Sequence, residues 1–197
     1  MNDFWNKRYS AEDYVYGEKP NEFVKQELSQ LKPGKILFAA EGEGRNAVYA
    51  AILGWQVTAF DLSTEGRKKA LQLSDKHNVI INYLIKGFEE IDFKKESFDC
   101  IILIFAHIHA SRRAEYHKKL ASFLKPGGKL IMESFSKEQL FHSSGGPKEF
   151  EMLYSREEMQ SDFAGFSELH IEKTETDLKE GNFHIGPASV IRVIGTK

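Results

Sequence analysis

The chain has 197 residues, of which 41% are hydrophobic and 28% are charged, a composition typical of a globular domain and not of a disordered or fibrous chain. Its 27 basic and 29 acidic residues give a formal net charge of −2, so no overall attraction for nucleic acid exists and we expect no nucleic-acid partner. The single cysteine, Cys100, excludes an internal disulfide, and the longest apolar run, residues 100–106, is too short to cross a bilayer. Because the N-terminus also lacks an apolar stretch of signal-peptide length, we expect a cytoplasmic protein with no membrane partner.

Short apolar runs alternate with segments of helical period from residue 35 onward, which is the pattern of a parallel sheet covered on both faces. Ser63 is placed to cap the helix that follows the second strand, and the basic run 67–69 in that helix predicts a solvent-exposed face. The run 98–105 is apolar on both faces, as expected of a central strand. The expected strands are 35–40, 56–60, 80–85, 98–105 and 129–135, and the expected helices are 46–53, the segment after Ser63, and 112–124.

The C-terminal part of the chain departs from this alternation. Residues 136–148 are polar and contain glycine, and we expect little regular structure there before a short helix near 156–163. Two further strand-like runs, 170–178 and 189–194, are separated by too few residues for a helical crossover, so they should pair antiparallel. The predicted fold is one α/β domain over 1–197. It is a three-layer, Rossmann-like architecture with a seven-stranded sheet that is mostly parallel and ends in an antiparallel hairpin; the strand order is left open.

A glycine-containing loop, Glu41-Gly42-Glu43-Gly44-Arg45-Asn46-Ala47, follows the first expected strand. Glycines let the backbone turn sharply and let a ligand approach the N-terminus of the next helix. Gly42, Gly44 and Ala47 also satisfy the loose dinucleotide-binding pattern G-x-G-x-x-A, which is a weak indication when taken alone. The loop therefore predicts a nucleotide-like cofactor without identifying it.

Charge separates the candidate cofactors. The pyrophosphate of a dinucleotide would meet Glu41 and Glu43, and each like-charge contact at about 4 Å costs on the order of 4 kcal/mol at an effective dielectric constant near 20. S-Adenosylmethionine instead brings a cationic sulfonium and a cationic ammonium, with one carboxylate that Arg45 or the helix N-terminus could hold. The loop therefore favours S-adenosylmethionine over NAD.

Asp61 ends the second expected strand, so its carboxylate should lie beside the glycine loop at the carboxyl edge of the sheet. There it can accept hydrogen bonds from both ribose hydroxyls of an adenosyl ligand. The alternative is a turn residue that caps the following helix. NAD enzymes use an acid at the same place, so Asp61 supports an adenosyl ligand without choosing between the two cofactors.

The chain resembles the class I S-adenosylmethionine-dependent methyltransferases, and within them the small TehB-like and thiol-methyltransferase-like proteins. The motifs that carry the resemblance span nearly the whole chain, and their order and spacing are more specific than any one of them. They are Trp5-x-x-Arg8-Tyr9, Tyr16-Gly17-x-x-Pro20-Asn21, Glu41-Gly-Glu-Gly-Arg-Asn46-Ala, Asp61-Leu-Ser63, Phe98-Asp99-Cys-Ile, Leu124-Lys-Pro-Gly-Gly128 and Glu180-Gly-x-x-His184-x-Gly186.

This resemblance implies S-adenosylmethionine as the cofactor, S-adenosylhomocysteine as its product, and an N-terminal segment, 1–30, that forms a helical cap over the cofactor. Trp5, Tyr9, Tyr14 and Tyr16 in that segment would either meet the sulfonium by cation–π contact or pack a helix against the edge of the domain. The cofactor-binding residues that the resemblance implies are Trp5, Arg8, Tyr16, Glu41, Gly42, Gly44, Arg45, Asn46, Asp61, Leu62, Gly87 and Phe88.

Two positions depart from the family pattern. Phe38 stands where an acidic residue is usual near the end of the first strand, so we assign the cofactor's amino group to Glu41. Gly87 stands where an aspartate often meets the adenine amine. The adenine would then be held by backbone amides and by apolar contact with Phe88, with Glu89 as an alternative acceptor.

The methyl acceptor should lie near the ends of the fourth and fifth strands. Phe105 and His107 follow the fourth strand in what resembles the family's substrate-facing segment, and His107 is the candidate catalytic residue because its unperturbed pKa lies near neutrality. Its alternative is a loop histidine bonded to backbone. Glu133 and Phe135 end the fifth strand and should border the acceptor pocket, unless they only pack in the core. His184 lies in the expected hairpin loop, where it would either approach the acceptor or be exposed.

We expect no metal. His107 and His109 have the alternate spacing that would place both on one face of an extended segment, but no third ligand is evident nearby. No carboxylate–histidine pair is evident in the sequence either.

The leading hypothesis is a methyltransferase acting on a small molecule, with a thiol or another chalcogen as the nucleophile, because a soft thiolate needs little base assistance. Its alternatives are a cofactor-binding regulatory or scaffold protein without turnover, and an NAD-dependent oxidoreductase. We expect a monomer or a weak homodimer whose partner is the small acceptor molecule.

Overall fold

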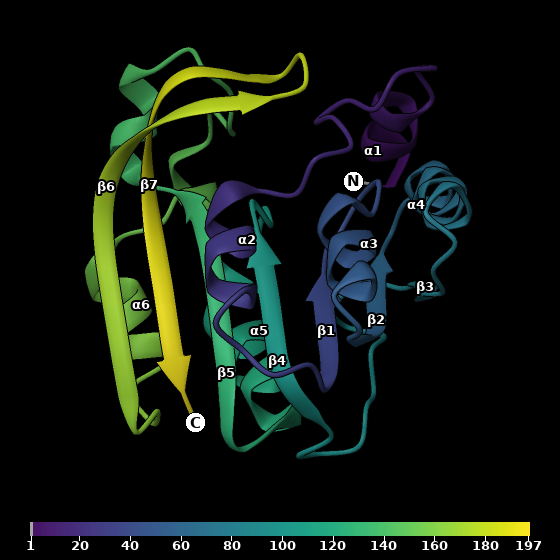
Figure 1. Ribbon diagram of the computed structural model, residues 1–197. Helices are drawn as coiled ribbons and strands as arrows, with labels where there is room; N and C mark the ends of the chain where they lie inside the picture. Colours follow the sequence, from purple (N-terminus) through teal and green to yellow (C-terminus); the bar gives the residue numbers. More distant parts are fainter. Residues whose placement is uncertain (1) are drawn as a thin grey trace.

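A seven-stranded sheet runs through the computed structural model, which describes residues 2–197 (Figure 1). Its strands are β1 (Lys35–Ala39), β2 (Gln56–Asp61), β3 (Asn82–Ile85), β4 (Phe98–Ile104), β5 (Leu124–Phe135), β6 (Glu168–Glu180) and β7 (His184–Thr196). The helices are α1 (Asn2–Tyr9), α2 (Glu22–Leu28), α3 (Arg45–Ile52), α4 (Thr64–Lys76), α5 (Ala110–Phe123) and α6 (Arg156–Asp162), with the 3-10 turns η1 (Lys137–Phe141) and η2 (Phe150–Met152).

The strand order is β3-β2-β1-β4-β5-β7-β6, and β7 is antiparallel to both of its neighbours. Strands β1 to β5 pair in parallel with one another. Helices α2, α3 and α4 pack on one face and α5 and α6 on the other, which gives the three layers seen in Figure 1. The Rossmann-like α/β fold predicted from the sequence is therefore confirmed, and the structure adds that β7 lies between β5 and β6.

The central position of β4 follows from its apolar residues on both faces. Ile101 and Leu103 belong to the core on the side of α5 and α6, whereas Cys100 and Ile102 belong to the core on the side of α2 and α3. Alternate residues of a strand point to opposite faces, so a strand buried on both sides reads as a continuous apolar run. Burial also raises the pKa of the Cys100 thiol, so this cysteine is a packing residue.

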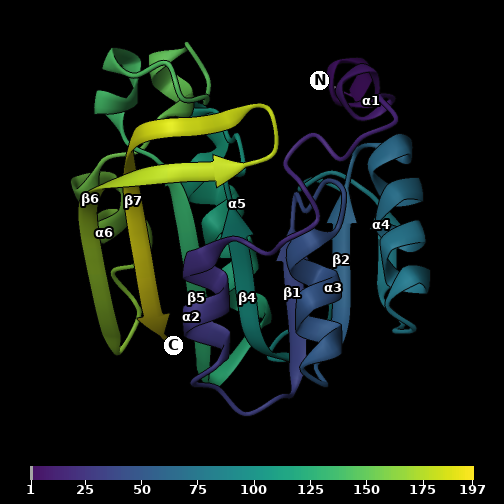
Figure 2. The ribbon, with the colours of Figure 1, turned by 45° about the horizontal axis from the view of Figure 1, so that its top comes forward.

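The C-terminal hairpin is longer than the sequence indicated. Strands β6 and β7 pair without interruption up to Glu180 and His184, and the end of the hairpin bends over the top of the sheet toward the segment that follows α1 (Figure 2). The backbone N–H of Asn182 donates to the carbonyl of Val15 at 3.1 Å. A Cβ on Gly181 would lie 2.2 Å from that carbonyl oxygen, so only glycine permits the contact.

The placement of His184 corrects the expectation of a loop residue. It is the first residue of β7, and only 4% of its surface is exposed. The prediction failed because the sequence suggested a loop over 179–188, whereas the paired strands occupy most of that range.

The expected N-terminal cap divides into two parts, and its first residue lies outside the described residues. Helix α1 packs against α4. Helix α2 instead buries Phe23, Val24 and Leu28 in the core beneath it, and its N-terminus is capped by Asn21, whose side chain accepts from the Val24 N–H at 3.0 Å. Only the part before α2 therefore lies near the top of the sheet.

Residues 136–148 are more ordered than their composition suggested. Gln139 in η1 is 1% exposed, donates to the Ser144 hydroxyl at 3.0 Å and accepts from the Ser189 N–H at 2.8 Å. These bonds fasten the segment to β7, because a buried amide needs partners for all of its polar atoms. Within residues 2–197, none of the helices has the length and apolar character required to cross a membrane.

Candidate active site

A pocket of about 340 Å³ opens at the carboxyl ends of the parallel strands, where ligands bind in open α/β sheets. The loops after β1, β2, β3 and β4 form most of it, and α1 and the start of β7 close it from above. Its lining residues are Trp5, Tyr9, Tyr16, Ala40, Glu41, Arg45, Asn46, Phe60, Asp61, Leu62, Lys86, Gly87, Phe88, Glu89, Ile104, Phe105, Ala106, His107, Ile108, His109, Arg112, Tyr116 and His184.

Glu41 faces this pocket and also caps α3. One of its carboxylate oxygens accepts from the backbone N–H groups of Asn46 at 2.9 Å and Ala47 at 2.8 Å. Burial raises the pKa of Glu41 from 4.5 to about 7, although these hydrogen bonds and the charge of Arg45 oppose the rise. The sequence analysis proposed the N-terminus of α3 as a binding site for the cofactor's carboxylate. Two N–H groups of that N-terminus are instead bonded to the carboxylate of Glu41.

We expected Glu43 to be a second negative charge facing the ligand, but Glu43 does not line the pocket. It forms a buried ion pair with Lys69 at 2.8 Å and accepts from the Val15 N–H at 2.9 Å. Lys69 is only 7% exposed, so the basic run 67–69 is not wholly a solvated face. The preference of the loop for a cationic ligand therefore rests on Glu41 alone.

The loop glycines serve packing and do not line the pocket. Gly44 has φ +85°, and a Cβ there would lie 2.5 Å from the Cβ of Ala70 in α4. A Cβ on Gly42 would lie 2.6 Å from the Tyr9 hydroxyl. These glycines let α4 and α1 approach the loop closely, and their role as cofactor contacts stays a prediction.

Asp61 lines the pocket and is not the residue that caps α4. Its carboxylate accepts from the Gly42 N–H at 3.0 Å and from the Ser63 N–H at 2.8 Å, while it also lines the pocket. The cap of α4 is Ser63, whose hydroxyl accepts from the Gly66 N–H at 3.0 Å. Burial raises the pKa of Asp61, and its backbone hydrogen bonds oppose that rise. The carboxylate is thus oriented by two amides at the pocket wall.

The loop after β3 forms an apolar wall beside Asp61. Leu62, Gly87 and Phe88 line the pocket, and the Phe88 ring stacks on Tyr116 with centroids 5.1 Å apart. The Tyr116 hydroxyl donates a hydrogen bond to the carboxylate of Glu89. This carboxylate, which the sequence analysis gave as an alternative acceptor for the adenine amine, is therefore already engaged. This wall has the flat shape of a site for an aromatic ring.

The two arginines implied by the resemblance have internal partners. Arg45 lines the pocket, but its guanidinium forms an ion pair with Glu180 of the hairpin at 2.8 Å. Arg8 is not part of the pocket lining. It donates to the Tyr16 hydroxyl at 3.3 Å, and its guanidinium lies 4.9 Å from the ring centroid of Phe4 and 4.5 Å from that of Phe183.

A second part of the pocket lining, which we call the aromatic end, is formed by Trp5, Tyr16, Phe105, His107 and His184. The ring centroids of Trp5 and His107 are 5.5 Å apart, and His184 lies 4.5 Å from Tyr16 and 4.8 Å from Phe105. Burial, aided by the nearby charges of His184 and Arg8, lowers the pKa of His107 to about 4. His107 is therefore neutral near pH 7. Tyr14 lies elsewhere, with its hydroxyl donating to the Lys69 carbonyl at 2.9 Å.

A carboxylate–histidine pair, which the sequence did not reveal, lies at the aromatic end. Glu180 contacts Nδ1 of His184 at 3.1 Å. Burial acts to raise the pKa of Glu180, but Arg45 and His184 hold it at about 2, so the carboxylate is ionised. Burial lowers the pKa of His184, and Glu180 opposes that change. The signal for this pair was the tight turn around Gly181, because a three-residue turn places Glu180 directly opposite His184.

Glu133 and Phe135 do not line the pocket, contrary to the expectation from the sequence. Glu133 is 1% exposed and accepts from the Asn21 amide at 2.7 Å and from Arg192 at 2.6 Å. Phe135 stacks beneath Phe105 with ring centroids 4.5 Å apart. Phe135 therefore supports Phe105 and His184 of the aromatic end, whereas the Glu133 carboxylate is used in buried contacts with Asn21 and Arg192.

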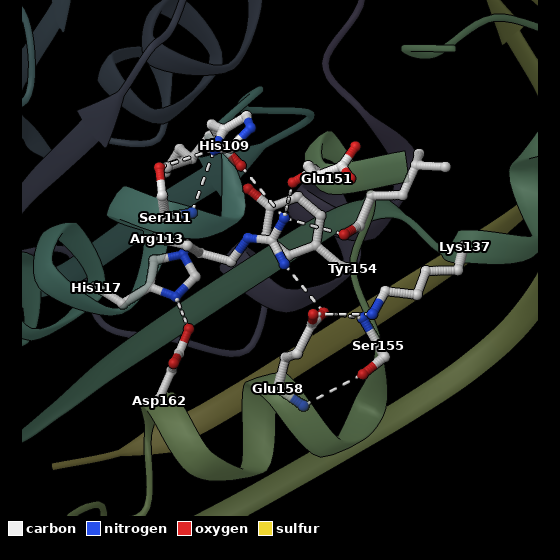
Figure 3. Close-up of polar contacts among 12 residues, drawn as sticks. His109, Ser111, Arg113, His117, Lys137, Glu151, Tyr154, Ser155, Glu158 and Asp162 are labelled. Atoms are coloured by element: carbon white, nitrogen blue, oxygen red, sulfur yellow. Dashed lines mark hydrogen bonds and ion pairs between the residues drawn. The ribbon is translucent and has the colours of Figure 1, made fainter. Parts of the chain in front are cut away.

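A polar network around Arg113 and Tyr154 (Figure 3) holds the loop after β4, which carries His107. The Tyr154 hydroxyl donates to the Ala106 carbonyl at 2.8 Å. Arg113 donates to the carbonyls of Ile108 at 3.3 Å and Leu153 at 2.9 Å. The loop therefore presents its side chains from a rigid frame. Within residues 2–197, no group of three or more His, Cys, Asp or Glu side chains is arranged to hold a metal ion.

Comparison with known proteins places this geometry in a family. Residues 37–132, which carry the strands and loops on the cofactor side of the pocket, match the model of a methyltransferase domain family. Just under half of the chain, 96 of its 197 residues, is therefore similar to methyltransferase domains. A curated relative of the chain is the ubiquinone/menaquinone biosynthesis C-methyltransferase UbiE of Haemophilus ducreyi, with 32% identity over 113 residues. That match covers 54% of this chain and 43% of the relative, so the chain spans less than half of the relative's length.

Solved structures share the fold of this chain across its whole length. TehB from Haemophilus influenzae matches with a TM-score of 0.71 and 18% identity, covering 100% of this chain and 66% of that chain. An S-adenosylmethionine-dependent methyltransferase from Aquifex aeolicus matches with a TM-score of 0.68 and 17% identity, covering 100% of this chain and 98% of that one.

Proposed function

We propose that the protein transfers a methyl group from S-adenosylmethionine to a small acceptor molecule, with a thiol or another chalcogen as the nucleophile. The observation that carries this proposal is the two-ended pocket. One end has the buried carboxylates of Glu41 and Asp61, and the other has rings and two histidines. A cavity of about 340 Å³ lies within the range of small-molecule sites.

The cofactor-side residues fit S-adenosylmethionine by their chemistry. Glu41 would hold the amino group and Asp61 the ribose hydroxyls, while Leu62, Gly87 and Phe88 would contact the adenine. When bound, S-adenosylmethionine supplies a methyl group that leaves for the acceptor, with the electron pair of the broken carbon–sulfur bond remaining on the cofactor. Trp5 and Tyr16 would shield the reacting atoms from water.

The aromatic end would hold the acceptor and take its proton. His184 is the better base of the two histidines, because Glu180 fixes its Nδ1 and supports positive charge on the ring. The acceptor proton would pass to Nε2 of His184 and from there to solvent. His107 has a pKa near 4 and no carboxylate partner among the described contacts, so it would shape the site rather than accept the proton.

Two alternative functions are disfavoured by specific contacts. A dinucleotide pyrophosphate would bind at the N-terminus of α3, but the Glu41 carboxylate occupies the N–H groups there. A binding protein without turnover has no need of the buried Glu180–His184 pair, because the ionised carboxylate and the polar ring are costly to enclose.

Thermal denaturation with candidate ligands tests the cofactor. At a hundred times its dissociation constant, S-adenosylmethionine or S-adenosylhomocysteine should add about 2.7 kcal/mol of stability, roughly 5–10 °C in melting temperature for a domain of this size. NAD should give no shift, and Asp61→Ala should abolish the shift given by S-adenosylhomocysteine. A shift with NAD alone would refute the cofactor assignment.

Methyl transfer is then measured with labelled cofactor and a panel of thiols, phenols and activated carbon acids. Thiols should be the best acceptors. The curated relatives are named as C- and O-methyltransferases, so preferred turnover of a phenol or a carbon acid would retain the methyltransferase and refute the thiol preference. Cofactor binding without turnover of any acceptor would favour the binding protein.

A further inference from the structure

We propose that the methyl acceptor is an uncharged molecule that carries an aromatic ring, and that this ring binds in the aromatic end formed by Trp5, Tyr16, Phe105, His107 and His184. This inference rests on the proposed function and narrows it from small molecules in general to one class. The inference follows from two features of the aromatic end. Its lining consists of rings, and the charged side chains near it already form contacts with other side chains of the protein.

The rings of the aromatic end enclose the space from several sides. Trp5 comes from α1, Tyr16 from the segment after it, Phe105 and His107 from the loop after β4, and His184 from β7. Phe135 supports them from below, with its centroid 4.5 Å from Phe105 and 5.2 Å from His184. Planar side chains that meet edge to face and face to face form a slot suited to another ring.

The charged groups around the aromatic end are engaged with one another. Arg45 pairs with Glu180, and Glu180 also accepts from Asn21 at 3.0 Å and contacts His184. Deeper in the domain, Glu133 pairs with Arg192. To bind a cationic acceptor, a carboxylate would have to leave one of these ion pairs. To bind an anionic acceptor, a guanidinium would have to leave one.

Arg8 is the one charged residue near the aromatic end for which no ion pair is described within residues 2–197. Its guanidinium has no carboxylate among the ion pairs of residues 2–197, but aromatic rings of Phe4 and Phe183 cover it and the Tyr16 hydroxyl accepts one of its hydrogens. It also lies outside the pocket lining. The positive charge of Arg8 lowers the pKa of His107 and of His184, which favours their neutral forms. Neutral histidines are consistent with an uncharged acceptor.

The energetic consequence is a strong bias by charge. A charged group that leaves water for this slot finds no free partner, and burying an unpaired charge is far more costly than burying an apolar ring. A ring gains both the removal of its apolar surface from water and aromatic contacts. The exposed rings of Phe4 and Phe183 continue this apolar surface outward, because Phe4 contacts Trp5 with ring centroids 5.2 Å apart and Phe183 contacts Tyr16 with ring centroids 6.4 Å apart.

Calorimetry on the full chain saturated with S-adenosylhomocysteine tests this inference without requiring turnover. The probes are four methyl thioethers that mimic methylated products: benzyl methyl sulfide, 2-(methylthio)ethanol, (methylthio)acetate and 2-(methylthio)ethylamine. They differ in ring and charge but share a thioether that does not titrate. We expect benzyl methyl sulfide to bind at least about tenfold more tightly than the neutral alcohol, and the two charged probes to bind more weakly than the alcohol.

Variants locate the effect. Trp5→Ala should lower the preference for the benzyl probe by about tenfold, whereas Trp5→Phe should retain most of it, since a ring is kept. Phe141→Ala removes a ring that is 88% exposed and outside the pocket lining, and it should leave all four affinities unchanged. If Trp5→Ala does not fold, the order of the four probes on the unmodified protein still decides the question.

The outcomes separate the inference from the proposed function. Tightest binding of (methylthio)acetate would mean that Arg8 serves an anionic acceptor, and equal binding of all four probes would mean an unselective slot; either result overturns the inference and leaves the methyltransferase in place. If S-adenosylhomocysteine itself does not bind, the proposed function fails and this inference fails with it.

Discussion

Replacing Glu41 with glutamine should weaken cofactor binding and remove its dependence on pH. The pKa of Glu41 is about 7, so roughly a tenth of this carboxyl is ionised at pH 6 and roughly nine tenths at pH 8. If the cofactor's ammonium binds the ionised form, the affinity for S-adenosylhomocysteine should rise roughly tenfold between these two pH values. Glu41→Gln loses the charge-assisted hydrogen bond, worth about 1.5–3 kcal/mol, and its weaker affinity should be flat with pH.

The same substitution should have the opposite effect on the stability of the cofactor-free protein. Because folding raises the pKa of Glu41 from 4.5 to about 7, its contribution to stability is complete below pH 4.5 and is lost as the pH rises through 7. At about 1.4 kcal/mol per pKa unit, the loss amounts to about 3 kcal/mol. Glu41→Gln should therefore match the unmodified protein at pH 4.5 and exceed its stability at pH 8.

Isothermal titration calorimetry at pH 6, 7 and 8 measures the affinity, and urea denaturation at pH 4.5 and 8 measures the stability. Glu172→Gln, on the exposed side of β6, is the matched control and should change neither quantity. His107 does not interfere, since its pKa lies near 4. A pH-independent affinity in the unmodified protein, or an unchanged pH dependence in Glu41→Gln, would refute the assignment of Glu41 to the amino group.

Three further predictions follow from contacts around the site. Gly44→Val should lower the melting temperature of the cofactor-free protein, because φ is +85° there and a Cβ would lie 2.5 Å from Ala70; an unchanged melting temperature would return Gly44 to the cofactor site. Lys69→Met should cost about 3–5 kcal/mol in urea denaturation by leaving Glu43 buried without its partner, and the double variant with Glu43→Gln should recover much of the loss; no recovery would mean that the lysine acts through packing alone. Glu180→Gln should lower kcat by about tenfold or more and move the acid limb of the pH–rate profile to lower pH, since the carboxylate supports positive charge on His184; a profile that keeps its position would remove His184 as the base.

The sequence by itself determined the layered α/β fold, because that fold depends on local patterns. The apolar run at 98–105, the Ser63 cap and the short apolar strands all reflect hydrophobic periodicity and capping, which are read within a few residues. The positions of Glu41 and Asp61 at the pocket wall also followed, since residues at the carboxyl ends of neighbouring parallel strands meet at one edge of the sheet.

Only the tertiary structure decided which charges are available to a ligand. Glu43 and Arg45 stand in the same loop as Glu41, but Lys69 takes the first and Glu180 takes the second. Both partners are distant in sequence, and an ion pair between distant residues leaves no periodic signal in the chain. The pairing of Glu180 with His184 depended likewise on the turn of a hairpin whose length the sequence did not reveal, because strand register is set by cross-strand contacts and turn geometry together.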